Sequence, residues 1–351
     1  MRAVAVVGFS QSPSLRREPD RNEVEILIPV LQSLREQTGV SGADCDFICS
    51  GSSDYLAGQP FAFVSGLDAV GAWPPVSESH VEMDGAWALY EAWVKIQTGE
   101  AETALVYGFS KSSMGDLPIT MALQLDPYSV MPLWPDAISI AGLQARHCLE
   151  AGLMTHRDMA SVAVRDRAHA KDNPNAQLKG DWTVDEILSE AFLVNPLRRS
   201  DCAPISDGAS AILLAAADRA GQICDRPAWI RGIEHICEPM ELGVRDLGRS
   251  RSVEIAAEKA GVASDKIDVA ELSAPFTHQS LLVEKALGLA GDTLVNPSGG
   301  ALAGNPLMAV GLSRIGECAS RIFSGAADRA VAHATSGPCL QQNLVCVLEG
   351  E

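Results

Sequence analysis

The sequence has no strongly basic stretch and no long hydrophobic run. Its 351 residues carry 27 Lys and Arg against 45 Asp and Glu, a formal net charge of −18. Such a chain disfavours nucleic acid and anionic membranes, since both are bound through basic surfaces. No segment reaches the roughly 18 to 20 apolar residues of a spanning helix, and residues 1–8 lack a signal peptide's apolar run and cleavage site. We expect a cytoplasmic protein with no nucleic-acid or membrane partner.

Clustered cysteines and C-terminal tyrosines are also missing. The nine cysteines are dispersed, and the one close pair, Cys45 and Cys49, has no second pair or histidine cluster to complete a zinc site. We therefore expect reduced, mostly buried thiols and no metal site. The tyrosines stand at positions 55, 90, 107 and 128. The C-terminal half thus has no tyrosine that could act as an acid.

The order of apolar runs predicts an α/β layered fold. With 47% hydrophobic and 21% charged residues, the chain is typical of a globular protein with two core-forming units. Strands are expected at residues 2–9, 47–50, 101–109, 210–216, 227–237, 267–272, 329–334 and 343–348. Helices are expected at residues 23–36, 85–98, 251–259, 277–287 and 302–322.

The second half of the sequence echoes the first. Residues 41–51 parallel residues 263–273, and residues 102–108 parallel residues 328–334. A duplication of this length predicts two similar α/β halves, each with its own sheet. The domains we expect are an N-terminal half (1–114 and 204–220), an inserted cap (115–203) and a C-terminal half (221–351). Ligands of such folds bind beyond strand carboxyl ends and at helix N-termini, so we place the chemistry at the seam.

Three segments resemble a known family. They are residues 196–209, the loop 271–279, and the glycine-rich stretch 296–311, which contains Pro297-Ser298-Gly299-Gly300 and Gly304-Asn305-Pro306. In their order and spacing they are similar to the thiolase superfamily, within it to sterol-carrier-type thiolases and their lipid-transfer-like relatives. The resemblance covers nearly the whole chain. It implies two duplicated βαβαβαββ halves in a five-layer α-β-α-β-α arrangement, and a homodimer formed through the N-terminal half.

The chain departs from the thiolase pattern where acyl transfer takes place. Alignment on Gly85 puts Glu82 at the nucleophilic cysteine and Asp84 beside it. Asn305 replaces the histidine of the family's Gly-His-Pro, and Ser273 replaces the oxyanion-hole residue. The loop of the second catalytic cysteine reads Thr335-Ser336-Gly337-Pro338. An acyl-enzyme mechanism is therefore not expected.

The resemblance leaves a pantetheine-sized tunnel that leads to two helix N-termini, whose backbone donors would face a thioester oxygen. Such a site suits retro-aldol cleavage of a β-hydroxyacyl-CoA, which needs a base and enolate donors but no covalent step. The chain resembles the thiolase-like aldolases that shorten CoA-activated steroid side chains in complex with a small zinc-ribbon/OB-fold protein. We expect a carbon–carbon lyase with such a partner, with CoA as part of the substrate and no covalently bound cofactor.

Each candidate residue has a simpler structural alternative. His278 is either a base at a helix start or a residue facing solvent or the dimer interface; His333 is either catalytic or a core histidine. Asn305 is either functional or an N-cap, and helix dipoles favour carboxylates at Glu82 and Asp84 with or without catalysis. Tyr55 is a further catalytic candidate that could reach the seam. The substrate-binding candidates are Ser273, Phe276, Ser298, Gly299, Ser336 and Gly337.

Two other functions remain open. The protein could be a non-catalytic lipid-CoA carrier or scaffold subunit, which a carboxylate at position 82 favours because it would repel an enolate. Residual acyl transfer is the second alternative and requires an unaligned thiol such as Cys339.

Overall fold

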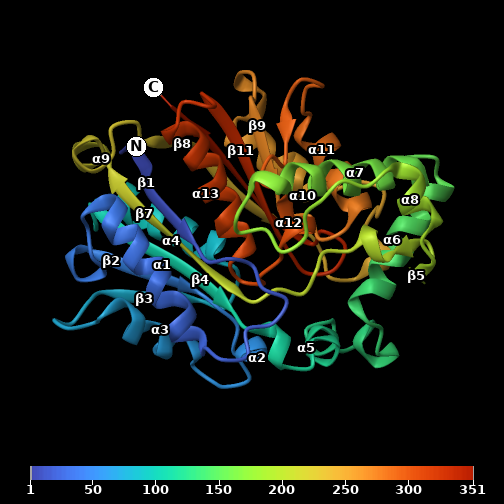
Figure 1. Ribbon diagram of the computed structural model, residues 1–351, viewed down its shortest axis with the longest axis horizontal. Coiled ribbons are helices and arrows are strands. Elements are labelled where there is room, and N and C mark those ends of the chain that lie inside the picture. Colours follow the sequence, from blue (N-terminus) through green and yellow to red (C-terminus); the bar gives the residue numbers. More distant parts are fainter. Residues whose placement is uncertain (1, 351) are drawn as a thin grey trace.

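A central sheet of ten strands runs through the molecule (Figure 1). The computed structural model describes residues 2–350. Five strands come from the N-terminal half: β1 (Val4–Gln11), β2 (Phe47–Gly51), β3 (Glu78–Val81), β4 (Thr103–Ser110) and β7 (Gly208–Ala216). Five come from the C-terminal half: β8 (Ala228–Cys237), β9 (Val269–Leu272), β10 (Leu294–Val295), β11 (Arg329–Ser336) and β12 (Gln342–Glu349).

The two halves meet along one narrow seam in this sheet. The strand order is β10-β9-β11-β12-β8-β1-β7-β4-β2-β3, so the halves join where β1 lies beside β8. Only two residue pairs align there, Ala5 with Trp229 and Val6 with Ala228. The expectation of two separate sheets was therefore wrong in this detail, because the first strand of each half pairs with that of the other.

Helices form three layers around the two halves of the sheet. Helices α4 (Gly85–Gln97) and α13 (Val310–Phe323) pack against each other between the halves. Helices α1 (Glu23–Thr38) and α3 (Ala62–Val70) cover the outer N-terminal face, and α10 (Arg251–Ala260) and α11 (Thr277–Leu287) the C-terminal one. The result is the expected five-layer α-β-α-β-α arrangement. The inner layer contains an extended cluster of buried apolar side chains, and each buried leucine or isoleucine in it contributes about 1.5 to 3 kcal/mol.

The sequence duplication is visible in matching hydrogen bonds. In the N-terminal half, the Asp46 carboxylate accepts the backbone N–H groups of Glu102 and Thr103, at 2.9 and 3.0 Å. In the C-terminal half, Asp268 accepts those of Asp328 and Arg329, both at 3.1 Å. Each aspartate precedes one strand, β2 or β9, and fixes the start of the neighbouring parallel strand, β4 or β11.

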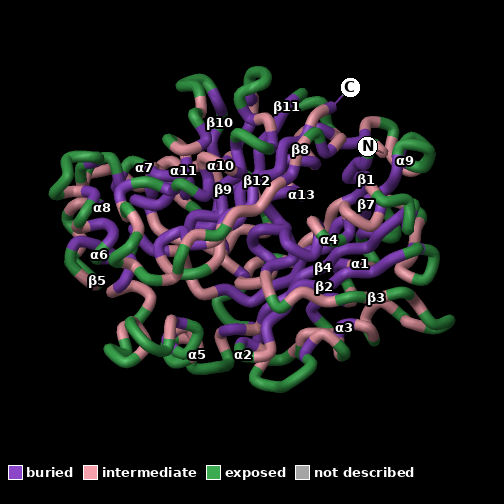
Figure 2. The backbone as a smooth tube through the Cα atoms, turned by 180° about the vertical axis from the view of Figure 1, so that it is seen from behind, coloured by how far each residue is buried: buried purple, intermediate pink, exposed green. Residues whose placement is uncertain are grey.

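The segment between the halves forms a largely helical cap. It contains α5 (Leu117–Leu123), α6 (Ala137–Glu150), α7 (His156–His169), α8 (Val184–Ser189) and a short hairpin of β5 (Phe192–Val194) and β6 (Leu197–Arg198). Helix α7 packs on α11 and on the short α12 (Gly300–Ala303) of the C-terminal half. Figure 2 shows that the chain around α5 and α8 is largely exposed, whereas the central strands of the sheet, such as β4, β12 and β7, are buried. Two more short helices, α2 (Asp54–Ala57) and α9 (Ala217–Ile223), lie on the N-terminal half.

One expected helix is broken. Residues 302–322 were expected as a single helix, but α12 ends at Ala303 and α13 begins at Val310. Pro306 lies between them, and proline both lacks the N–H that a helix needs and disfavours helical backbone in the residue before it. No helix within residues 2–350 is long and apolar enough to cross a membrane.

Candidate active site

The two inner helices begin at a common point, which is occupied by Asp84. This side chain is almost fully buried and is the N-cap of α4, where it accepts the N–H of Ala86 at 2.8 Å. The same carboxylate accepts the N–H groups of Gly311 and Leu312 at 2.9 and 3.0 Å, in the first turn of α13. One carboxylate therefore caps two helices that belong to different halves. Burial raises its pKa, and the three backbone N–H groups act in the opposite direction.

These contacts overturn the expectation that both helix N-termini offer free donors to a thioester oxygen. Asp84 takes three of the N–H groups, and Gly85 donates its N–H to the carbonyl of Met308 at 2.8 Å. Asp84 is thus a structural residue in this geometry rather than a base that a substrate could reach.

Glu82, in contrast, reaches the surface. Its side chain is 48% exposed, accepts the backbone N–H of Asp54 at 2.7 Å and lies 3.3 Å from Nε2 of His80. Nδ1 of His80 faces the Ser50 hydroxyl at 3.2 Å, and its ring stacks on Phe63. A carboxylate and an imidazole therefore lie together at the position aligned with the thiolase nucleophile.

Tyr55 lies on α2 and directly follows Asp54, whose backbone N–H donates to Glu82. Tyr55 is 64% exposed, and the Asp54 carboxylate holds the start of α3 by accepting the N–H groups of Phe61 and Ala62. No contact places Tyr55 at the seam.

His278 lies in the core. It is fully buried on α11, and its Nε2 lies 3.2 Å from Oε1 of Gln144, which comes from the cap helix α6. Burial lowers its pKa to about 3, so the imidazole is neutral at pH 7 and is a poor base. Both earlier interpretations, a base at neutral pH and a residue facing solvent or a dimer interface, are incompatible with this position.

His333 is likewise a core histidine. It lies within β11, which continues to Ser336, and its Nε2 is 2.9 Å from Oδ1 of Asn343 on β12. Burial lowers its pKa to about 4. The alternative that we left open for this residue, a core position, is the one that the structure shows.

Asn305 lies in the loop between α12 and α13 rather than at a helix start, so the N-cap alternative is wrong. The residue is half-buried, and its backbone N–H donates to Oγ of Ser206 at 2.9 Å. Within residues 2–350 its side-chain amide has no hydrogen-bond partner. Ser336 is half-buried and ends β11, and the exposed Gly337 that follows it has a φ of 74°, which favours glycine.

Two of the substrate-binding candidates serve packing in the C-terminal half. The Ser298 hydroxyl donates to Glu271 at 2.7 Å and accepts from Arg314, within a buried Glu271–Arg314 ion pair of 2.9 Å. Gly299 has a φ of 97°, and an added Cβ would lie 2.5 Å from that of Ala303. The Ser298 hydroxyl and the space beside Gly299 are therefore already used in packing.

The remaining two substrate-binding candidates, Ser273 and Phe276, lie in the segment just before α11. Ser273 is buried and donates its backbone N–H to the carbonyl of His333 at 3.0 Å. Phe276 is half-buried, pairs with Cys202 and is the residue before α11.

A cavity of about 400 Å³ lies between β1, α1, α13 and the cap segment 172–175. Of the predicted site residues it includes Ser298 alone; Asp172, Glu317 and Arg321 provide its charges. It is therefore not the tunnel toward the α4 and α13 N-termini that the resemblance implied. Among residues 2–350 no group of three His, Cys, Asp or Glu side chains gathers as a metal site.

Known proteins of similar sequence and structure share this architecture. No protein-family model matches the chain. It is 28% identical to an acetyl-CoA acetyltransferase of Methanothermobacter thermautotrophicus, over 96% of this chain and 95% of that protein. Human sterol carrier protein 2 is 28% identical over 74% of this chain and 54% of its own length. The benzoylsuccinyl-CoA thiolase subunit BbsB of Thauera aromatica is 26% identical over 56% of this chain and 59% of that protein.

Two solved structures match the whole chain. An Ltp2-ChsH2(DUF35) aldolase superposes with a TM-score of 0.82 at 18% identity, covering 99% of this chain and 98% of that one. Human mitochondrial 3-ketoacyl-CoA thiolase superposes with a TM-score of 0.78 at 18% identity, over 100% and 99% of the two chains. The chain has the thiolase fold. In sequence the chain is similar to an acetyl-CoA acetyltransferase and to sterol carrier protein 2, and in fold it is similar to an aldolase and a thiolase.

No thiol of this thiolase-fold protein is activated. All nine cysteines are free, and burial raises the pKa of each of them. The pKa of Cys339, the thiol nearest to the second catalytic loop, rises to about 12. A nucleophilic cysteine needs the opposite shift, toward the thiolate.

Sequence reasoning missed the polar groups that organise the thiolase fold here. Asn296 has a φ of 49°; its Oδ1 accepts the N–H of Leu272 at 2.7 Å and its Nδ2 donates to Asp166 of the cap at 2.8 Å. The Glu271–Arg314 pair and the His80–Glu82 pair were also missed. The glycines that follow Asn296 signalled a turn, but the partners lie far away in the sequence.

Proposed function

We propose that this protein is a carbon–carbon lyase that cleaves a β-hydroxyacyl-CoA, with a steroid side chain as the acyl group, by a retro-aldol reaction. The observation that carries the proposal is the occupation of the inner helix junction by a buried carboxylate, Asp84, in a chain whose thiols all have raised pKa values. A site without an activated thiol favours a reaction of a CoA thioester that does not pass through an acyl-enzyme. The fold neighbour that is an aldolase supports the same reaction class.

In this proposal the reaction uses two side chains that remain accessible. Glu82, held beside His80, takes the proton of the β-hydroxyl group. The bond between Cα and Cβ then breaks, which releases a ketone or aldehyde and leaves the thioester enolate. The free side-chain amide of Asn305 donates to the enolate oxygen, as an oxyanion-hole donor does. The enolate takes a proton back at Cα and leaves as a shorter acyl-CoA, so CoA enters as part of the substrate and no other cofactor is needed.

We further propose a homodimer and a second, different subunit. Strand β3 is the open edge of the sheet in the N-terminal half, and its residues are half-buried or exposed, so it is the place where a second copy would pair. The solved aldolase is a complex with ChsH2(DUF35), and the Thauera relative is named as a subunit. We expect a zinc-ribbon/OB-fold protein as the corresponding partner of this chain.

A non-catalytic role as a lipid-CoA carrier or scaffold is the second candidate. It is favoured by the helix N–H donors that Asp84 already occupies and by the similarity to sterol carrier protein 2.

The test is incubation of the protein, with and without the zinc-ribbon/OB-fold protein, with a branched β-hydroxyacyl-CoA that carries a steroid nucleus. Mass spectrometry should detect a shorter acyl-CoA and a steroid ketone or aldehyde. Glu82→Gln should slow the release about 100-fold or more, because general base catalysis contributes that much. Binding without release would support the carrier instead. Cys339→Ser should retain full activity; loss of activity in this variant would indicate acyl transfer through that thiol.

A further inference from the structure

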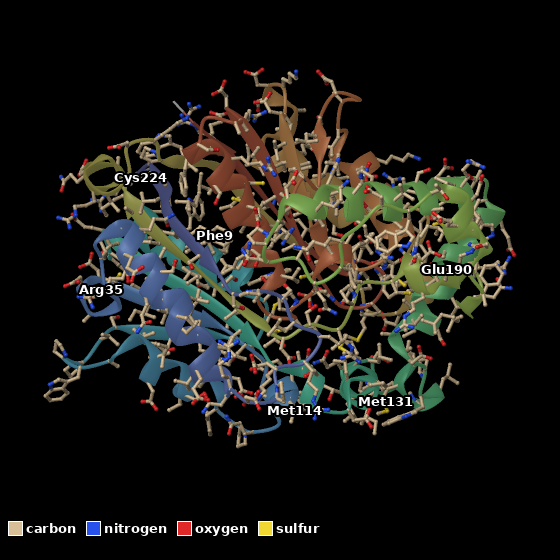
Figure 3. All side chains as sticks on the ribbon, viewed as in Figure 1. Phe9, Arg35, Met114, Met131, Glu190 and Cys224 are labelled. Carbon is tan, nitrogen blue, oxygen red and sulfur yellow. The ribbon has the colours of Figure 1, made fainter. Side chains whose placement is uncertain are left out.

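One edge of the cap exposes an unusual number of large apolar side chains. Within residues 2–350, six of the seventeen exposed large hydrophobic residues fall between positions 114 and 134. We call residues 114–136 the cap edge. Its exposed apolar side chains are those of Met114, Ile119, Leu123, Tyr128, Leu133 and Trp134. Met114 and Met131 are labelled along this edge in Figure 3, at the lower border of the molecule.

The backbone of the cap edge also holds an aromatic residue in a strained conformation. Trp134 has a φ of 49° and is 52% exposed. A left-handed backbone is unfavourable for a bulky side chain, typically by about 1 to 3 kcal/mol. Tyr128 is 92% exposed, and Leu133 is 78% exposed. The chain thus presents large apolar groups here, including its most exposed one, Tyr128, without burying them against its own core.

The charge of this region is of one sign. Between residues 112 and 145 there is no lysine or arginine, and there are three aspartates, Asp116, Asp126 and Asp136. Each is fixed in place because its carboxylate accepts backbone N–H groups at the start of a turn or helix. An apolar surface with fixed acidic groups is complementary to a surface that is apolar with basic groups around it.

We propose that the cap edge is the docking surface for the second subunit, and that this subunit meets it with an apolar patch surrounded by lysine and arginine. This inference rests on the hetero-complex of the proposed function. A second copy would place aspartates against aspartates in a chain of net charge −18, and an anionic membrane would meet the same repulsion. The 23 residues of the edge match the 20 to 30 residues that one side of a standard interface contributes, about 800 Å².

The experiment uses the full chain and the zinc-ribbon/OB-fold protein from the same genome. A photo-reactive benzoylphenylalanine is placed at position 128 or 134, with position 294 as the control because Leu294 is 42% exposed on β10, the last strand of the sheet in the C-terminal half. Irradiation should cross-link the second subunit from positions 128 and 134 and not from 294. The double variant Leu133→Lys with Trp134→Lys should weaken the Kd at least tenfold, and Leu294→Lys should change it less than twofold. Added salt should weaken the wild-type complex.

The outcomes separate this inference from the proposed function. Cross-links between two copies of this chain, or unchanged affinity in the double variant with an unchanged melting temperature, would overturn the docking surface. Cleavage by the chain alone with no binding of the subunit would also overturn it, and would leave the lyase standing. Cross-links from positions 128 and 134 in a complex that cleaves nothing would keep the docking surface and remove the lyase. If the chain neither binds the second subunit nor cleaves the substrate, both the docking surface and the lyase function are excluded.

Discussion

The two halves of this molecule share a plan but differ in how their inner helices begin. Asp46 and Asp268 occupy equivalent places and make equivalent hydrogen bonds, so the strand ends are positioned in the same way in both halves. Helix α4 has its own N-cap in Asp84, whereas Ala309, the residue before α13, has no capping side chain. Helix α13 uses Asp84 from the other half instead. Duplicated halves have therefore become dependent on each other at the point where a thiolase places its chemistry.

The halves differ in buried histidines as well. His278 and His333 are fully buried in the C-terminal half, with pKa values lowered to about 3 and about 4. The histidine of the N-terminal half that contacts a carboxylate, His80, keeps part of its side chain in solvent. The C-terminal half should therefore be the acid-sensitive one.

The largest effect that tests this comparison is acid destabilisation of the C-terminal half. An unfolded histidine binds a proton near pH 6.5, whereas folded His278 and His333 do so only near pH 3 and 4. The stability that each contributes is present above pH 6.5 and is lost as the pH falls toward the folded pKa. At pH 4 the loss is on the order of 3 kcal/mol for each histidine. Urea denaturation from pH 7 to pH 4 measures it.

Acidification has the opposite effect through Asp166. Because the pKa of its carboxyl in the folded protein is raised to about 6, its protonation favours the folded state as the pH falls. The informative quantity is therefore the difference between the wild type and His333→Gln, whose amide can still donate to Asn343. This difference should shrink or reverse on acidification. A difference that is constant with pH would show that His333 is not buried as a neutral imidazole.

Asp84→Ala should have the next largest effect. It leaves three buried N–H groups unpaired and uncaps two helices, so we expect a loss of about 3 kcal/mol or more in the free energy of unfolding. Asp84→Asn should cost less, because its amide oxygen keeps one acceptor and avoids a buried charge. Asp116→Ala, which removes the cap of the short α5 alone, is the matched control and should cost about 1 kcal/mol. Equal losses for positions 84 and 116 would contradict the shared cap.

The smallest effect is expected for substitutions of the two equivalent aspartates, Asp46 and Asp268. Asp46→Ala and Asp268→Ala should each lower the free energy of unfolding by about 1 to 2 kcal/mol, because each leaves two backbone N–H groups without their acceptor. Asp46→Ala should lower the free energy of unfolding slightly more than Asp268→Ala, because Asp46 also accepts the Thr103 hydroxyl at 3.2 Å. A much larger loss at one position would show that the two halves are not equivalent at their strand ends.

Much of the fold could be predicted from local sequence. The long strands and the inner helices show clear apolar patterns, whereas the short strands β3 and β10 were not predicted. The repeat of residues 41–51 in residues 263–273 indicated the duplication. The error at residues 302–322 came from reading an apolar run as one helix across Pro306, although proline is a local signal against it. Helices α2 and α3 were not predicted.

The candidate site was harder to predict because its contacts are distant in sequence. Asp84 meets Gly311 and Leu312 more than 220 residues away, so its position before a helix indicated one cap but not two. The burial of His278 depends on Gln144 of the cap, which no pattern around position 278 reveals. Residue type and motif position predict where the chemistry of the family would lie, and tertiary packing decides which of these side chains remain exposed.

The shared carboxylate of Asp84 has a consequence for the history of the chain. A duplicated gene begins with two copies that can each fold by the same rules, and either copy can be lost. Once one copy starts its central helix on a side chain supplied by the other, separation exposes backbone donors that nothing else satisfies. From that point the two units are inherited as one. An attempt to express residues 221–351 alone would encounter this same dependence.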